Sequence, residues 1–143
     1  MPDEAVRPAG TIIAFDFGLR RIGIAVGQTV TGSARALEVV PASGRPDWQS
    51  ISAIVNAWKP AAMVVGLPLA GDGGETEMSK GARRFGRQLQ DRFATPVFFQ
   101  DERLTSFAAE QRYVNARSGG GMKRKDAALK DAIAAQIILE NWL

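Results

Sequence analysis

Between residues 11 and 40, short apolar runs alternate with polar turns, and this pattern predicts three β-strands. The strands are expected over residues 11–17, 22–26 and 36–40, and the first carries a carboxylate, Asp16, inside its apolar run. Because only a short glycine-containing turn separates the first two runs, they are expected to form a hairpin. Strands joined by short connections pair antiparallel, so the three leading strands predict an antiparallel meander.

Helical periodicity begins after this meander and alternates with two further apolar runs. Apolar residues recur every three or four positions over 46–58 and 75–92, which predicts two helices. The uninterrupted apolar run at 61–66 is typical of a central strand that is buried on both faces, and the run at 96–99 predicts another short buried strand. Strands that alternate with helices pair in parallel, so the chain predicts an α/β fold with a mixed five-stranded sheet and helices on both faces.

The last forty residues predict two more helices, separated by a basic loop. The helices are expected at about 105–114 and at 126–142, and the second is strongly apolar. Residues 117–125 between them are rich in glycine and in lysine and arginine. Because the chain shows no internal repeat and no linker, we expect a single domain over residues 1–143, with a flexible segment at 1–9.

The composition excludes several kinds of chemistry, because the 143 residues include no histidine and no cysteine. Zinc sites built from these residues, thiol nucleophiles and histidine-based triads are therefore ruled out. The absence of cysteine fits a reducing compartment. No apolar run approaches the ~20 residues of a membrane span, and the first residues do not resemble a signal peptide. We therefore expect a cytoplasmic protein with no membrane partner.

Positive charge is concentrated in the second half of the chain, although the net charge is only +3. Residues 1–80 hold 7 basic and 8 acidic residues, whereas residues 81–143 hold 11 basic and 7 acidic residues. A basic cluster attracts nucleic-acid phosphates whatever their sequence, but a solvated loop explains the same charge. The candidate phosphate contacts are Arg20, Arg21, Arg103, Lys123, Arg124 and Lys125.

Three acidic residues lie where the pattern predicts buried or strand-end positions. Asp16 is inside the first strand, Glu102 follows the last predicted strand, and Asp131 lies on the apolar side of the terminal helix. A buried carboxylate is costly unless it is paired, hydrogen-bonded or bound to a metal. Separate salt bridges are one explanation, with the nearby arginines Arg20, Arg21 and Arg103. Convergence of the three carboxylates on one site is the other.

Converging carboxylates require a cation, because like charges repel each other. Oxygen ligands without histidine or cysteine suit Mg²⁺ or Mn²⁺. Such ions activate water and stabilise the leaving oxygen in phosphodiester cleavage. This explanation predicts a metal-dependent nuclease whose catalytic and metal-binding residues are Asp16, Glu102 and Asp131.

Two glycine loops are weaker candidates for phosphate binding. Residues 16–18 and 71–74 could present backbone amides to a phosphate, but a hairpin turn and an ordinary loop explain the same glycines. The sequence contains no P-loop motif, and no Gly-x-Gly-x-x-Gly opens a helix after the first strand. These absences argue against P-loop nucleotide hydrolases and dinucleotide-binding folds.

Four segments of the chain resemble the motifs of one protein family. They are residues 13–26, 65–69, 101–106 and 130–139. Together, in this order, they resemble the YqgF (RuvX-type) family of RNase H-like nucleases, and the similarity runs from about residue 10 to residue 143. The resemblance implies an RNase H-like fold and a cytoplasmic bacterial nuclease. Members are described as Holliday junction resolvases and as enzymes that mature the 5′ end of pre-16S ribosomal RNA.

Motif position carries the catalytic, metal-binding role of this family onto Asp16, Glu102 and Asp131. Ser106 departs from family members that have threonine there, but it keeps a hydroxyl group. The resemblance implies precursor ribosomal RNA or branched DNA as the partner, and cleavage of a junction would favour a homodimer because two strands are cut. Two alternatives remain: an RNA-binding module without catalysis, and an ATP-handling domain of the actin-like or sugar-kinase type, which would need a second domain.

Overall fold

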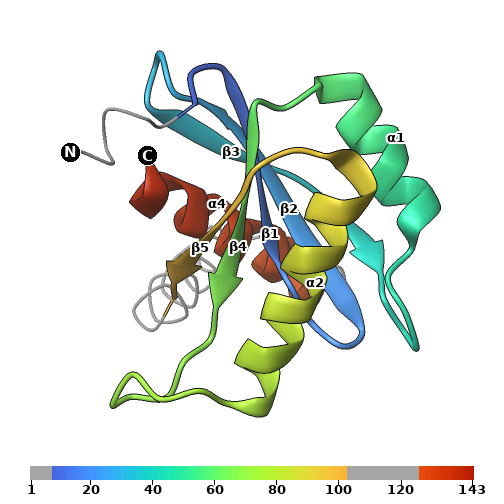
Figure 1. Cartoon of the computed structure of the whole chain (residues 1–143), viewed down its shortest axis with the longest axis vertical. Helices are drawn as coiled ribbons and strands as arrows, with labels where there is room; N and C mark the ends of the chain where they lie inside the picture. The colour runs from blue at the N-terminus through green and yellow to red at the C-terminus, as the bar shows by residue number, and fades with distance from the viewer. Residues whose placement is uncertain (1–7, 103–125) are drawn as a thin grey trace.

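The computed structural model describes residues 8–102 and 126–143, and within this part of the chain five strands form one sheet (Figure 1). The strands are β1 (Thr11–Asp16), β2 (Arg21–Gln28), β3 (Ser33–Pro41), β4 (Ala62–Leu67) and β5 (Val97–Asp101). The helices are α1 (Trp48–Trp58), α2 (Glu77–Phe93) and α4 (Asp126–Trp142). The helix predicted at about 105–114, the loop 117–125 and most of the segment 1–9 lie outside the described residues.

The order of the strands across the sheet is β3-β2-β1-β4-β5. β2 pairs antiparallel with both β1 and β3, whereas β4 pairs parallel with both β1 and β5. The predicted mixed sheet is therefore confirmed. Three strands are longer than predicted, because β2 continues to Gln28, β3 begins at Ser33 and β5 continues to Asp101. Glu102 consequently follows the end of β5 directly. The predicted burial of the strand at 96–99 was wrong, because β5 lies at the edge of the sheet and its residues are only partly buried.

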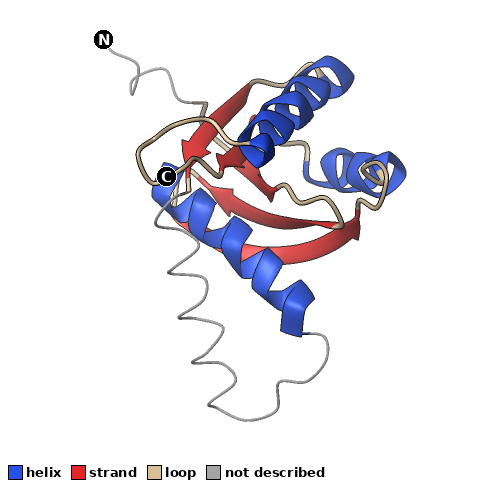
Figure 2. Cartoon of the chain, turned by 90° about the horizontal axis from the view of Figure 1, so that it is seen from below, coloured by secondary structure: helices blue, strands red, loops and turns tan. Residues whose placement is uncertain are grey.

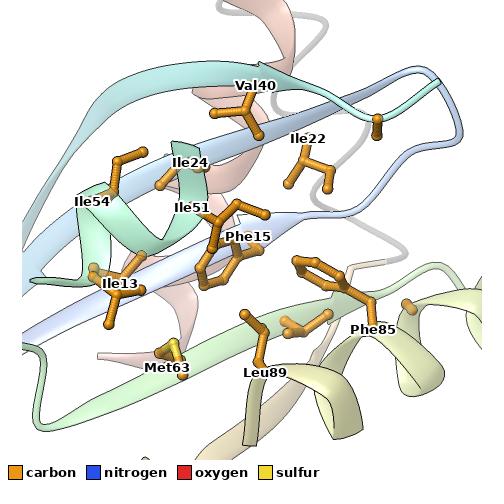
Figure 3. Packing of buried hydrophobic residues seen from close by; sticks show 14 of the residues in the cluster. Ile13, Phe15, Ile22, Ile24, Val40, Ile51, Ile54, Met63, Phe85 and Leu89 are labelled. Carbon is orange, nitrogen blue, oxygen red and sulfur yellow. The ribbon is translucent and has the colours of Figure 1, made fainter. Parts of the chain in front are cut away.

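Helices cover both faces of the sheet, as predicted (Figure 2). One face packs against α1 and α2 in a core that includes Phe15 from β1 and Phe85 from α2 (Figure 3). The Phe85 ring lies 5.4 Å from the Phe15 ring, 5.2 Å from the Phe17 ring and 5.5 Å from the Trp48 ring, measured between centroids. These contacts fix the beginning of α1 and the middle of α2 over the end of β1.

The other face of the sheet packs against α4 in a second core. Its members include Ile12 and Ala14 from β1 and Ile138 and Leu139 from α4. Successive side chains of a strand point to opposite faces. Since Ile12 and Ala14 face α4, Asp16 continues the same side, and Phe17 lies on the side of α1 and α2. Across residues 8–102 and 126–143, every helix is too short or too polar to cross a membrane.

Candidate active site

Asp16 and Glu102 lie at one edge of the sheet, although 86 residues of sequence separate them. Asp16 ends β1, Glu102 follows β5, and both strands run parallel to β4, which lies between them. The carboxyl ends of these strands therefore meet at one edge, as the placement of Glu102 predicted. The amide of Glu102 donates a hydrogen bond to the carbonyl of Leu67 at 3.1 Å, which anchors its backbone to β4. The Glu102 residue is buried, with 5% exposure.

Gly66 of β4 leaves the space that the Glu102 side chain occupies. A Cβ atom at this position would lie 2.9 Å from Oε2 of Glu102 and 2.5 Å from Cδ1 of Ile138. A larger residue would push the carboxylate away from the strand or displace α4. The sequence analysis assigned no role to this residue. A glycine inside an uninterrupted apolar strand is the signal that marks such a close approach.

The two carboxyl groups contact each other, and both pKa values are raised. Burial is the main cause of the rise in the pKa of Asp16 to about 7, and repulsion by Asp131 adds to it, while a hydrogen bond from Glu102 opposes it. Burial also raises the pKa of Glu102 to about 8, with smaller contributions from Asp16 and Asp101. The carboxyl groups therefore titrate as a pair.

The raised pKa values predict that the metal-free protein loses stability as the pH rises. In the unfolded chain the ordinary pKa values of Asp16 and Glu102 are 3.8 and 4.5, so the folded state binds protons more tightly. Stability is greatest below those values and decreases as the pH rises through about 7 and about 8. We expect a decrease above about 1.4 kcal/mol, the equivalent of one pKa unit.

Urea unfolding in EDTA at about pH 5, 6.5 and 8 measures this decrease in the free energy of unfolding. The chain has no histidine or cysteine, so the α-amino group is the only other ordinary group that titrates in this window. Asp47 and Glu75, whose pKa values are lowered by hydrogen bonds to Ser50 and to Arg83, titrate below it. A free energy of unfolding that stays constant between pH 5 and 8 would contradict the buried pair.

Asp131 lies beside this pair, but its carboxylate is held by an arginine. The Nε atom of Arg21 donates to Oδ2 of Asp131 at 2.7 Å, with side-chain exposures of 44% and 27%. The salt-bridge explanation therefore holds for Asp131, while its charge still raises the pKa of Asp16. In residues 8–102 and 126–143, no three acidic side chains are grouped closely enough to hold a metal ion.

The other predicted phosphate contacts divide into one exposed residue and four that cannot be placed. Arg20 is exposed in the turn between β1 and β2, and its carbonyl accepts a hydrogen bond from Ala42 at 2.8 Å. The residues outside the described ranges are Arg103, Lys123, Arg124 and Lys125. Their role in binding phosphate stays a prediction, as does that of Arg20 and Arg21.

The two glycine loops have structural explanations. A Cβ atom at Gly18 would lie 2.6 Å from the carbonyl oxygen of Arg21, so the tight turn itself requires glycine. In the loop before α2, Asp72 accepts a hydrogen bond from the amide of Gly74 at 2.8 Å. The first turn of α2 is capped by its own residues, Thr76 and Ser79. Neither loop gives independent support for a phosphate site.

Two solved structures share this architecture. Thermus thermophilus RuvC in complex with a Holliday junction substrate matches with a TM-score of 0.51 and 18% identity, covering 90% of this chain and 91% of RuvC. The fowlpox virus Holliday junction resolvase matches with a TM-score of 0.55 and 10% identity, covering 93% and 99%. At these identities the likeness establishes the fold alone, and it places the chain in the class of RNase H-like folds.

Within that class, the chain belongs to the RuvX family. The family model described as "RuvX: Holliday junction resolvase" matches residues 10–143. A protein of Pseudomonas paraeruginosa is 46% identical over 140 residues, covering 97% of this chain and 95% of the relative, and is named "Putative pre-16S rRNA nuclease". A protein of Xanthomonas euvesicatoria with the same name is 45% identical over 146 residues, covering 100% and 94%. The family predicted from the four motifs is therefore confirmed.

Proposed function

We propose that this chain is a divalent-metal-dependent endonuclease that hydrolyses phosphodiester bonds in precursor 16S ribosomal RNA. The observation that carries the proposal is the Asp16–Glu102 pair at the carboxyl edge of β1, β4 and β5. The two carboxyl groups are in contact, their pKa values are raised, and neither forms a salt bridge with a residue in the described part of the chain. Such a pair at a strand edge is expensive to keep unless it serves a ligand.

The donor atoms of this site fit a hard divalent cation. Asp16 and Glu102 supply carboxylate oxygens at one place, and oxygen-only ligation favours Mg²⁺ or Mn²⁺. Asp131 would complete the set by its motif position, and its carboxylate would then have to move from its ion pair with Arg21 toward the pair, because the three side chains of the described residues are not grouped closely enough to hold a metal ion. When bound, a cation of this kind supplies Lewis-acid activation of water and stabilises the charge of the leaving oxygen.

The side chains of the site would bind and orient the reacting groups. Asp16 and Glu102 must lose their protons to act as ligands, and because their pKa values are raised, metal binding would be coupled to proton release. Arg21 keeps Asp131 in place through its ion pair with this carboxylate. Since the chain has no histidine, no imidazole takes part in moving the proton of the attacking water.

The choice of RNA as the substrate rests on the relatives. The proteins from Pseudomonas and Xanthomonas that share 45–46% identity with the chain are named as pre-16S rRNA nucleases. The description of the matching family model favours a second function, the resolution of Holliday junctions. Resolution requires cuts in two strands, so that second function predicts a symmetric homodimer.

A cleavage assay with three substrates separates these functions. We expect the protein to cleave a precursor of 16S ribosomal RNA in the presence of Mg²⁺ or Mn²⁺, and to leave a four-way DNA junction and a linear DNA duplex intact. Cleavage of the junction alone, by a species that sediments as a dimer, would overturn the RNA substrate in favour of the resolvase. Stable RNA binding without cleavage of any substrate would instead indicate a binding module.

A further inference from the structure

A cavity of about 370 Å³ lies on the α2 side of the same sheet edge. Three segments that are far apart in sequence form it: the turn between β1 and β2, the loop before α1, and the exposed side of α2 (Figure 1). The side chains that matter here are Phe17, Leu19, Arg45, Arg84 and Gln88. The cavity has no role in the fold or in the carboxylate site described above.

The charged side chains that line this cavity, among the described residues, are both positive. Arg45 and Arg84 reach it from two different elements, and no aspartate or glutamate of residues 8–102 and 126–143 lines it. Within the described ranges, neither guanidinium group forms an ion pair or a side-chain hydrogen bond. By contrast, Arg83 of the same helix binds Glu75 at 2.9 Å, and Arg92 stacks over Trp48 at 4.1 Å. Two guanidinium groups without an acidic partner favour a phosphate.

The wall of the cavity is apolar and partly aromatic. The Phe17 ring is held against Phe85 at a centroid distance of 5.2 Å, so its position is fixed by the core. Leu19 also lines the cavity and is 68% exposed, so its side chain is accessible to a ligand. Nucleic-acid-binding proteins combine such surfaces with basic groups, because bases stack on the surface while the backbone contacts the charges. Phosphate and base recognition together define a nucleotide.

The cavity and the carboxylate pair are lined by consecutive residues at the end of β1. Asp16 lies on the α4 side of the sheet, and the next residue, Phe17, lines the cavity on the α2 side. Consecutive Cα atoms are about 3.8 Å apart. A nucleic-acid strand that is bound at Asp16 and Glu102 therefore needs only to pass over the edge of the sheet to enter the cavity. The two sites are thus placed to hold neighbouring parts of one strand.

We propose that this cavity is a nucleotide subsite that holds the substrate strand beside the cleavage position. Arg45 and Arg84 bind a phosphate of the strand, and Phe17 and Leu19 contact its base. The inference rests on the proposed nuclease function and extends it, because it assigns strand binding to residues outside the basic loop 117–125 and the family's acidic motifs. It also gives Arg45 and Arg84 a role that neither charge nor motif predicted.

The test measures binding of a single-stranded RNA of about 12 nucleotides by fluorescence anisotropy in EDTA, which keeps cleavage out of the measurement. We expect Arg45→Ala and Arg84→Ala each to weaken binding by about tenfold and to lower the slope of log K against log salt by about 0.7, the value for one phosphate on a single strand. Arg87→Ala is the matched control, since Arg87 is exposed on the same helix but does not line this cavity.

A second measurement locates the base. RNA carrying 4-thiouridine should form a photo-cross-link with the peptide that contains Phe17 and Leu19. Equal affinities for Arg45→Ala, Arg84→Ala and Arg87→Ala would overturn the subsite, even if the wild-type protein cleaves RNA. If the wild-type protein cleaves no substrate, but Arg45→Ala and Arg84→Ala lose RNA binding while Arg87→Ala keeps it, the subsite stands and the proposed nuclease function fails.

Discussion

Asp16→Asn is expected to abolish metal-dependent cleavage and, at the same time, to stabilise the metal-free protein. Asparagine keeps the shape of the side chain but removes a carboxylate from the pair with Glu102. If the pair binds the metal, activity should fall by more than about 100-fold. Loss of a residue that only orients a metal ligand lowers activity by up to about 100-fold, so a larger loss indicates that Asp16 binds the metal itself. Activity is measured on the substrate that the wild type cleaves, at saturating Mg²⁺.

The gain in stability follows from the same contact. Burial raises the pKa of Asp16 to about 7, so the folded protein carries an unfavourable charge above that pH. An amide at this position has no charge to bury and can donate a hydrogen bond to Glu102. We expect urea unfolding at about pH 8 in EDTA to give a free energy at least about 1 kcal/mol higher for Asp16→Asn than for the wild type.

Asp91→Asn provides a matched control, since Asp91 is exposed on α2. Asp91→Asn should leave the cleavage activity unchanged. It should alter the free energy of unfolding by no more than about 0.5 kcal/mol, as for an ordinary surface substitution. Normal turnover by a folded Asp16→Asn protein would refute the catalytic role. Lower activity together with lower stability would assign Asp16 a structural role instead.

Hydrophobic patterning was sufficient to predict the sheet and its helices. The continuous apolar run of β4 is buried along its whole length, as that pattern predicted, and the apolar run of β1 is buried at its inner positions. The unusual placement of Asp16 and Glu102 was also visible, because an acid at the end of an apolar strand is costly. These features are local in sequence, so they need no knowledge of distant contacts.

The partners of Asp131 could not be predicted in the same way. A helical wheel places Asp131 on the buried face of α4, but Arg21 is 110 residues away, and their contact depends on how α4 crosses the β1–β2 hairpin. The sequence left three arginines as equal candidates. Arg45 and Arg84 share one cavity for a similar reason, since a loop and a helix meet there only after the sheet has formed.

The crossing of α4 over the sheet depends on a single glycine of β2. Gly23 pairs with Asp16 in the sheet and lies directly beneath the backbone of α4. A Cβ atom at this position would overlap the carbonyl group of Asp131 and would lie 3.0 Å from the amide nitrogen of Ala132. These are backbone atoms, so no side-chain rotation can relieve the overlap.

Gly23→Ala is therefore expected to destabilise the protein by about 3 kcal/mol or more, the upper range for overpacking a well-packed interior. Because α4 must move away from β2, Asp131 should also lose its position beside Asp16, and cleavage should fall even at temperatures where the variant remains folded. Thermal unfolding and the cleavage assay measure the two effects. Gly71→Ala is the control, because a Cβ atom at Gly71 would meet nothing within 4 Å. A Gly23→Ala protein with wild-type stability would show that α4 does not pack on β2 through this residue.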